Sequence, residues 1–302
     1  MHISRRDFFK GLGAGAGAAL LLKSTETDKV LAASSPASGT SSGKAMLHDA
    51  SMCTGCRACQ TACKQWNSLP AESTGYGGIY DNPRGLSSQT WTLIKARELS
   101  TNGEKDLLLC KYQCMHCTEA ACVKVCPTNA LTYHPLGFVA YDEDKCSGCG
   151  YCADACPFQV PHLAGNTLTG IQKMRKCTFC QDRVPEGRQT ACAEACPADA
   201  ILYGDRDELI VEGKKRVDQI KNTYPRARLY GENELGGLHV MYVLKEAPPV
   251  YQIPEQPQVS AATIAWKEVI QPVGWAVGGL TILGLGLNYL VARTSVKSRK
   301  EK

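Results

Sequence analysis

The chain has 302 residues, enough for one or two domains with hydrophobic cores. Its 17 cysteines are many for a cytosolic enzyme and, at this length, too few for a small disulfide scaffold. The formal net charge is +5, but most of the excess lies in residues 1–33 and 293–302, so the body between them is nearly neutral. A nearly neutral body argues against a nucleic-acid-binding domain, which needs a basic face.

Residues 1–33 have the three parts of an export signal. The segment SRRDFFK, residues 4–10, resembles the twin-arginine export motif. A weakly apolar run at residues 11–22 and a small-residue, cleavage-like stretch at residues 31–33 follow it in the order of a signal peptide. The alternative, a chance arginine pair before an amphipathic start, does not explain that order. The Ser/Gly-rich residues 34–44 are predicted to be a flexible linker.

The predicted body, residues 45–250, contains four runs of four cysteines. The first and third runs share the spacing C-x2-C-x2-C-x3-C, whereas the second and fourth widen the middle gap. A proline follows the last cysteine of the last three runs. The body is therefore an internal repeat of cysteine quartets. In chain order they are Cys53, Cys56, Cys59 and Cys63; Cys114, Cys117, Cys122 and Cys126; Cys146, Cys149, Cys152 and Cys156; and Cys177, Cys180, Cys192 and Cys196.

Short regular elements are predicted beside these quartets. Residues 130–141 have the apolar pairs and central turn of a β-hairpin. Residues 200–203 predict a strand, and residues 205–222 predict a helix. Residues 64–109 are predicted to form a long insertion with one strand, at residues 91–95.

The cysteine spacing is typical of iron–sulfur proteins. Three cysteines within a seven-residue loop can surround one face of a 4Fe–4S cluster. We expect a helix to start at the fourth cysteine and to direct it toward a second cluster, as in two-cluster ferredoxins. Two quartets then hold two clusters, and four quartets hold four 4Fe–4S clusters.

The order of the quartets suggests how they pair. The second and third are neighbours joined by the predicted hairpin, so they can close one ferredoxin unit, and the first and fourth must then pair around it. The expected fold class is α+β, with two interleaved ferredoxin-like modules. The predicted ligand sets are Cys53, Cys56, Cys59 and Cys196; Cys63, Cys177, Cys180 and Cys192; Cys114, Cys117, Cys122 and Cys156; and Cys126, Cys146, Cys149 and Cys152.

Zinc binding and disulfide formation are the two alternative uses of these cysteines. Paired C-x2-C motifs also build zinc sites, which would make the chain a structural or interaction module, but zinc sites rarely use triple x2 spacing followed by C-P. Disulfides fit poorly with an odd cysteine count. The seventeenth cysteine, Cys110, is expected to be a buried free thiol rather than a replacement ligand.

Polar residues beside the quartets admit two interpretations. His116 could form a hydrogen bond near a cluster, but a side chain that only faces the next loop is the simpler expectation. Lys173, Arg175 and Lys176 could offset cluster charge, whereas a solvated basic turn is the default.

The export signal and the cysteines explain each other. Clusters are inserted into thiolates in a reducing compartment, and the twin-arginine route carries folded proteins. A threading route would expose bare cysteines to oxidants.

Near the C-terminus, residues 269–292 contain no ionisable side chain and are long enough to cross a bilayer. A buried core helix is the alternative. Residues 251–268 are a connector, and the tail, residues 293–302, is basic. Positive charge favours the cytoplasmic side, so we expect a cytoplasmic C-terminus and a body on the periplasmic side of the inner membrane.

The quartets, the prolines and the C-terminal anchor resemble the iron–sulfur subunits of membrane-bound molybdopterin oxidoreductases and related hydrogenases. Three narrower motifs are similar to the formate dehydrogenase beta subunit: CKQWN at residues 63–67, CTFCQDR at residues 177–183 and GGLHVMYVL at residues 236–244. The resemblance implies the same nested clusters. It also implies a catalytic alpha subunit that oxidises formate at molybdenum or tungsten, and an integral membrane gamma subunit, often a cytochrome, that reduces quinone.

An export signal on the cluster subunit itself is more similar to the iron–sulfur subunit of a membrane-bound nickel–iron hydrogenase, which remains the alternative. No nucleophile elbow, phosphate loop or dinucleotide fingerprint is present in the sequence. We therefore expect a non-catalytic electron-transfer subunit.

Overall fold

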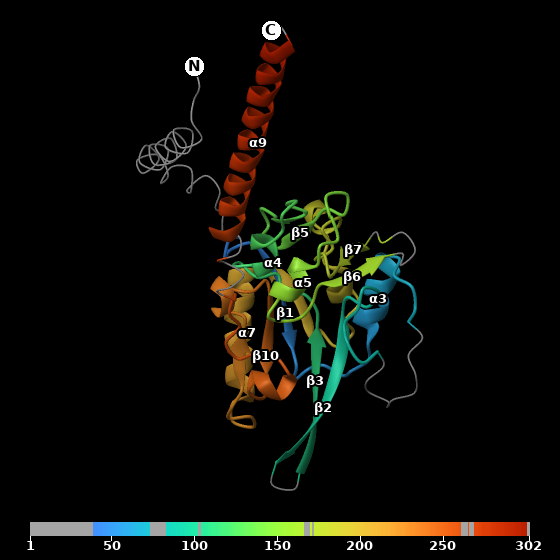
Figure 1. Cartoon of the computed structure of the whole chain (residues 1–302). Helices are drawn as coiled ribbons and strands as arrows, with labels where there is room; N and C mark the ends of the chain where they lie inside the picture. The colour runs from blue at the N-terminus through green and yellow to red at the C-terminus, as the bar shows by residue number, and fades with distance from the viewer. Residues whose placement is uncertain are drawn as a thin grey trace. The chain divides into compact units, whose positions relative to one another are not determined.

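The computed structural model describes residues 39–72, 83–101, 104–165, 170, 172–260, 265 and 269–300 (Figure 1). The predicted signal peptide, residues 1–33, lies outside the described residues.

A four-stranded sheet joins the two ends of the body. Its strands are β1 (Lys44–Asp49), β8 (Ile201–Asp205), β9 (Arg228–Tyr230) and β10 (Val240–Leu244), in the spatial order β8-β1-β10-β9. Strands β1 and β10 are parallel, and the two outer strands are antiparallel to their neighbours. The predicted strand at residues 200–203 is confirmed as β8.

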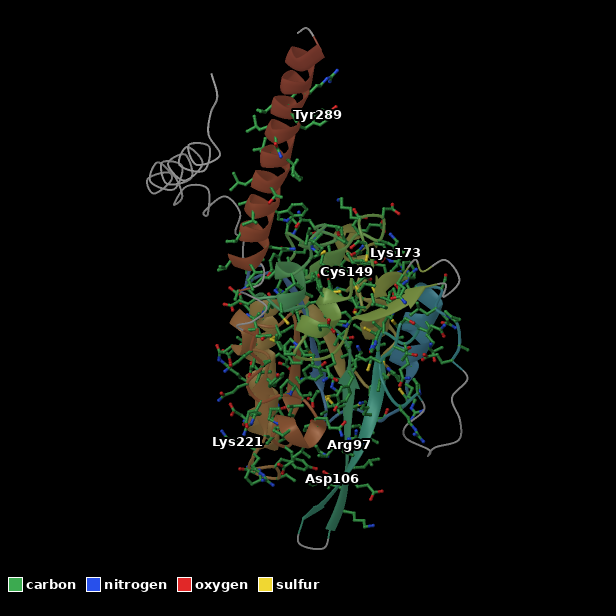
Figure 2. All side chains as sticks on the ribbon, in the orientation of Figure 1. Arg97, Asp106, Cys149, Lys173, Lys221 and Tyr289 are labelled. Atoms are coloured by element: carbon green, nitrogen blue, oxygen red, sulfur yellow. The ribbon has the colours of Figure 1, made fainter. Side chains whose placement is uncertain are left out.

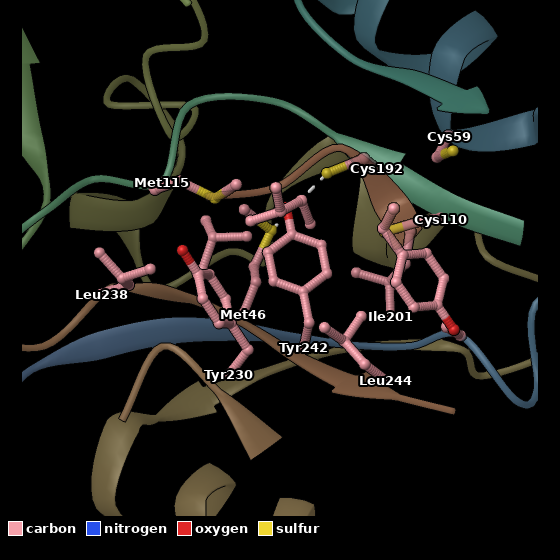
Figure 3. Packing of buried hydrophobic residues seen from close by; sticks show 14 of the residues in the cluster. Met46, Cys59, Cys110, Met115, Cys192, Ile201, Tyr230, Leu238, Tyr242 and Leu244 are labelled. Carbon is pink, nitrogen blue, oxygen red and sulfur yellow. Dashed lines mark hydrogen bonds between the residues drawn. The ribbon is translucent and has the colours of Figure 1, made fainter. Parts of the chain in front are cut away.

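The two faces of this sheet have different partners, as the alternation of side chains along a strand requires. Ala45 and Leu47 of β1 pack with helix α7 (Arg206–Ile220), through Leu209 and Val217. Met46, between them, faces the opposite core, which also contains Cys59, Cys110, Cys192 and Tyr242 (Figure 3). The sheet therefore separates α7 from the cysteine-rich core, and α7 confirms the helix predicted at residues 205–222.

Along the chain, three β-hairpins lie between strands β1 and β8. Strands β4 (Leu131–Tyr133) and β5 (Val139–Tyr141) confirm the predicted hairpin. Strands β6 (His162–Gly165) and β7 (Gln172–Arg175) form a second hairpin that the sequence did not predict.

The prediction of a single strand within residues 64–109 was wrong. Strands β2 (Leu93–Thr101) and β3 (Glu104–Tyr112) form a long antiparallel hairpin, with Lys95 opposite Cys110. Figure 2 labels Arg97 on β2 and Asp106 on β3. The sequence did not predict β3 because its apolar and polar residues do not alternate with burial. The strand buries Leu108 and Cys110, but it also buries the charged Lys111.

Four short helices each begin one residue before the third cysteine of a quartet. They are α3 (Ala58–Trp66), α4 (Ala121–Lys124), α5 (Tyr151–Ala155) and α6 (Ala191–Glu194). The expectation that a helix starts at the fourth cysteine was therefore wrong. The helix holds the third cysteine in its first turn and places the fourth one turn further along. Helix α3 packs against α6, and α4 against α5.

The C-terminal helix α9 spans Gln271–Lys300. By length and composition, Gln271–Arg293 is long and apolar enough to cross a membrane, with a mean hydropathy of 1.5. This stretch matches the predicted span at residues 269–292 closely. Its large apolar side chains are exposed, Trp275 by 80%. Short 3-10 turns at Val184–Glu186, Glu234–Gly236 and Pro248–Tyr251 complete the regular structure.

Candidate metal centres

Four cysteines from distant parts of the chain line a small cavity, called site 1. They come from the loop before α3, from α3 itself and from the end of α6. His48 on β1 and Ile94 on β2 also line this cavity. The cysteines of site 1 are Cys53, Cys56, Cys59 and Cys196.

A second small cavity, called site 2, is lined by residues of helices α3 and α6. Its cysteines are Cys63, Cys177, Cys180 and Cys192. Met46, Thr92 and Gln113 also line it. Met46 Sδ lies 3.7 Å from Cys192 Sγ, and Figure 3 shows the two residues together in the core.

The remaining two groups come from the second and third quartets. Site 4, a small cavity, is lined by Cys126, Cys146, Cys149 and Cys152, with Tyr141 beside them. Site 3 is recognised from electrostatics rather than from a cavity. Burial, and then the nearby thiols of three other cysteines, raise the pKa of Cys117 well above its ordinary value; these are Cys114, Cys122 and Cys156.

The structure thus brings together all four predicted groups of cysteines. Helix α3 carries Cys59 into site 1 and Cys63 into site 2, one turn apart. Helix α4 and the residues after it do the same for Cys122 and Cys126 at sites 3 and 4. Each group therefore combines cysteines of two quartets, as the predicted ligand sets do.

The loops that carry the cysteines repeat one backbone conformation. The residue before the second cysteine of each quartet has a positive φ: 71° at Gly55 and Gly148, 47° at His116 and 61° at Phe179. Two of the four are glycines, which adopt this region freely, and the other two are held there by burial. The same backbone conformation at the same position of all four quartets indicates a common structural task.

The thiols are chemically suited to metal rather than to free reactivity. Burial raises the pKa of Cys59, Cys152 and Cys177 to about 12. Such thiols become thiolates only when a metal replaces the proton. Backbone N–H groups already point at several sulfurs. Met174 N lies 3.5 Å from Cys146 Sγ, and Ala191 N lies 3.4 Å from Cys180 Sγ. Amide donors of this kind stabilise negative charge on sulfur.

The cysteines of a site surround a cavity rather than a point. Within the described ranges, no three His, Cys, Asp or Glu side chains are grouped so that they could hold a single metal ion. A zinc ion takes sulfur ligands at about 2.3 Å from one centre. In a 4Fe–4S cluster each thiolate binds a different iron, so sulfurs spread around a cavity suit it.

His116, for which the sequence left two interpretations, has a structural role. His116 is fully buried, stacks edge-on against Phe179 and accepts a hydrogen bond at Nδ1 from the Val139 N–H, at 3.1 Å. Burial lowers its pKa well below the ordinary range, so the ring is neutral. His116 therefore faces the next hairpin, in agreement with the simpler expectation.

The expected solvated basic turn is not what the structure shows. Lys173 and Arg175 lie on β7, and Lys176 follows it. Lys176 is 1% exposed and donates to the Val139 and Cys177 carbonyls. Lys173 donates to the Cys146 carbonyl at 2.7 Å. These lysines tie the loop of site 4 and the start of the fourth quartet to the inner hairpins.

Sequence reasoning missed several residues around sites 1 and 2. His48, Thr92 and Gln113 are buried and line the two cavities, and Asn67 Nδ2 lies 3.6 Å from Cys63 Sγ. Asn67 belongs to the CKQWN motif, which was the only signal available in the sequence. Cys110 is buried in the core on β3, as expected for a free thiol.

Comparison with known proteins gives two family matches. The model described as a 4Fe-4S dicluster domain matches residues 105–206, and the model of a twin-arginine translocation pathway signal sequence matches residues 2–21.

Full-length relatives extend these matches over most of the chain. The formate dehydrogenase iron-sulfur subunit of Haemophilus influenzae is 38% identical over 85% of this chain and 83% of its own length. The nitrate-inducible formate dehydrogenase iron-sulfur subunit of Escherichia coli K12 is 38% identical over 82% of this chain and 84% of its own. The Hydrogenase-2 operon protein HybA of Escherichia coli O157:H7 is 32% identical over 93% of this chain and 94% of its own.

Proposed function

The chain belongs to the family of formate dehydrogenase iron–sulfur subunits, and we propose on that premise how its sites serve electron transfer. It carries four 4Fe–4S clusters and acts as the electron-transfer subunit of a membrane-bound oxidoreductase of the formate dehydrogenase type. It is exported by the twin-arginine route and anchored by its C-terminal helix, with its body on the periplasmic side.

The proposed ligand sets are the four groups defined above as sites 1 to 4. The observation that carries this assignment is that each group combines three cysteines of one quartet with one of another. The packing of α3 on α6 and of α4 on α5 supports two interleaved ferredoxin-like modules within residues 45–250. When bound, each cluster accepts and releases one electron.

The positions of the sites support a linear order. Sites 1 and 2 adjoin through α3, and sites 3 and 4 through α4. Sites 2 and 3 adjoin because Cys63 and Cys177 pack in the same buried cluster as Cys114. Cys56 of site 1 and Cys149 of site 4 are the cysteines classed as exposed. Sites 1 and 4 are therefore the two ends of the series, where partners can approach.

Catalytic and membrane subunits are the partners that this family membership implies. The proposed catalytic partner holds molybdopterin with molybdenum or tungsten and oxidises formate. The proposed membrane partner is a cytochrome or another quinone-reducing subunit. Sites 1 and 4 are the two exposed ends of the series, and one exposed end for each partner supports the proposal of two partner subunits.

A nickel–iron hydrogenase is the second candidate for the catalytic partner. One observation favours it: the relative named for the Hydrogenase-2 operon spans 93% of this chain, more than the formate dehydrogenase relatives span. Isolation of the membrane complex under anaerobic conditions, followed by identification of the large subunit, separates the two. A molybdopterin protein supports formate, and a nickel–iron protein supports hydrogen.

The relay itself is tested by iron and acid-labile sulfide analysis of the same preparation. We expect about sixteen irons per chain, because four clusters contain four irons each. A brown preparation with broad visible absorption should accompany that ratio. A colourless preparation with about four zinc ions per chain would establish the structural zinc module instead.

The ligand sets are tested by a series of cysteine-to-serine variants studied by EPR. We expect Cys53→Ser and Cys196→Ser to alter the same cluster, and Cys180→Ser to alter another. The nested pairing is wrong if Cys196→Ser changes the signal that Cys180→Ser changes.

A further inference from the structure

A lysine is buried between sites 1 and 2. Lys111 lies near the end of β3 and is 1% exposed. Its Nζ donates a hydrogen bond to Gln113 Oε1. In the part of the chain that the structure describes, no carboxylate forms an ion pair with it. A fully buried lysine is rare unless an anion accompanies it, because its desolvation is otherwise uncompensated.

The neighbours of Lys111 belong to both sites. Ile94, directly opposite Lys111 in the β2–β3 ladder, lines site 1. Gln113, which accepts the lysine's hydrogen bond, lines site 2. Burial, and then the positive charge of Lys111, lower the pKa of His48 in site 1 to about 3. The ammonium therefore acts on both cavities.

The thiols of the two sites act on the lysine in return. Burial lowers the pKa of Lys111, but the cysteines around it outweigh burial and raise this pKa above its ordinary value. They are Cys59 of site 1, and Cys63, Cys177 and Cys192 of site 2. The lysine remains a cation in this setting.

Gln113 gives this cation a second effect. Because Oε1 accepts from Lys111, the amide Nε2 is left as a donor, and it has no hydrogen-bond partner within the described structure. The side chain is 1% exposed and lines site 2, the same cavity that four cysteines line. Lys111 thus fixes the orientation of an amide donor at that site.

A 4Fe–4S cluster with four thiolates carries net negative charge, which grows by one on reduction. A fixed cation nearby favours the reduced state and so raises the reduction potential. We propose that Lys111 is a countercharge shared by the clusters of sites 1 and 2, which raises the reduction potentials of both. The inference rests on the cluster assignment proposed above. Each reduction adds one electron to a cluster, and Lys111 keeps its proton throughout.

The test is an EPR-monitored redox titration of the purified membrane complex containing Lys111→Met. Methionine keeps most of the volume and removes the charge. We expect two of the four clusters to become harder to reduce, by at least tenfold in the reduction equilibrium, which is 59 mV for a one-electron couple. The affected signals should be those altered by Cys196→Ser and Cys180→Ser, and the other two should not move.

A matched control removes another buried lysine. Lys245 is 7% exposed and pairs with Asp106 at 2.7 Å, away from the cysteines. Lys245→Met should leave all four potentials unchanged. Lys111→Arg keeps the charge and should stay closer to the wild type than Lys111→Met does.

Several outcomes would overturn the proposal. Unchanged potentials in a Lys111→Met complex that retains about sixteen irons would do so, as would equal shifts in the Arg and Met variants. If Lys111→Met fails to assemble, Gln113→Leu provides the second test. It should lower the potential of the site 2 cluster alone, and no shift there would end the proposal. A wild-type complex without iron would refute the proposed function instead.

Discussion

At the scale of single residues, the side chains around the candidate sites differ more than the cysteines do. Site 1 contains His48, whose two ring nitrogens have no hydrogen-bond partner within the described structure. At site 4 burial opposes ionisation of Cys146, but hydrogen bonds from the Met174 N–H and the Tyr141 hydroxyl lower the pKa of that thiol. Site 2 contains Thr92 and Gln113. Because hydrogen bonds to sulfur help to set the potential of a cluster, the four sites are chemically distinct despite identical ligands.

The glycines of the cysteine loops carry the first residue-scale prediction. Gly148 has φ +71°, and a Cβ there would collide with the carbonyl oxygen of Gln172 on β7. Alanine adds about 1–2 kcal/mol for the left-handed backbone, and the neighbouring strand must also move. We expect Gly148→Ala to lose the site 4 cluster, measured as about twelve irons per chain instead of about sixteen.

Gly187 provides the matched control for this variant. Its φ is +78°, but a Cβ there would meet nothing within 4 Å. Gly187→Ala therefore bears only the backbone strain and should retain all four clusters. Equal iron content in the two variants would show that the contact with β7 does not shape the site.

The residue scale also shows how far sequence reasoning can reach. The four cysteine groups were predicted from spacing and chain order, because three ligands of a cluster come from one quartet and the fourth from the quartet paired with it. His48 and Lys111 could not be found that way. A polar residue in a short strand looks solvent-facing, and only the fold reveals that both lie buried against cysteines.

At the scale of elements, the sequence predicted those helices and strands whose apolar residues recur at regular intervals. It missed strands beside the candidate sites, where burial does not follow that pattern. Helix α7 and the β4–β5 hairpin bury apolar residues at regular intervals. In β7, by contrast, only Met174 is buried, so the strand lacks a readable apolar face. Strand β3 buries a lysine, which a hydrophobic pattern rejects.

The start of α7 carries the element-scale prediction. Arg206 is 4% exposed and donates to the carbonyls of Ser41, Gly231, Glu232 and Leu238. It therefore joins the chain before β1 to the loop before β10. Arg206→Met leaves buried carbonyls without donors, and we expect a loss of about 3 kcal/mol in the free energy of unfolding.

The adjacent residue offers a control for this loss. Asp205 pairs with Lys44 at 2.9 Å, but both side chains are substantially exposed. Asp205→Ala should cost less than about 1 kcal/mol, as exposed ion pairs usually do. Thermal unfolding followed by circular dichroism would measure both. A similar midpoint for the two variants would mean that the arginine is not a structural tie.

At the scale of the whole molecule, export and cluster loading depend on each other. Sites 1 and 2 draw cysteines from both ends of the body, so neither is complete until β1 has paired with β8 and β10. A chain that crossed the membrane unfolded would expose every thiol to oxidants. The twin-arginine signal resolves this, because the protein can cross after its clusters are in place.

This dependence leads to the last prediction, which separates export from anchoring. Replacing Arg5 and Arg6 together by lysine should block export and leave the precursor in the cytoplasm with its irons. Removal of residues 261–302 should leave export intact but release the body into the periplasm, because the apolar span Gln271–Arg293 is lost. Cell fractionation with iron analysis of each fraction distinguishes these results.

If the truncated chain stays in the membrane fraction even without partner subunits, α9 is not its anchor. If the double-lysine variant reaches the periplasm iron-free, the signal does not couple loading to export.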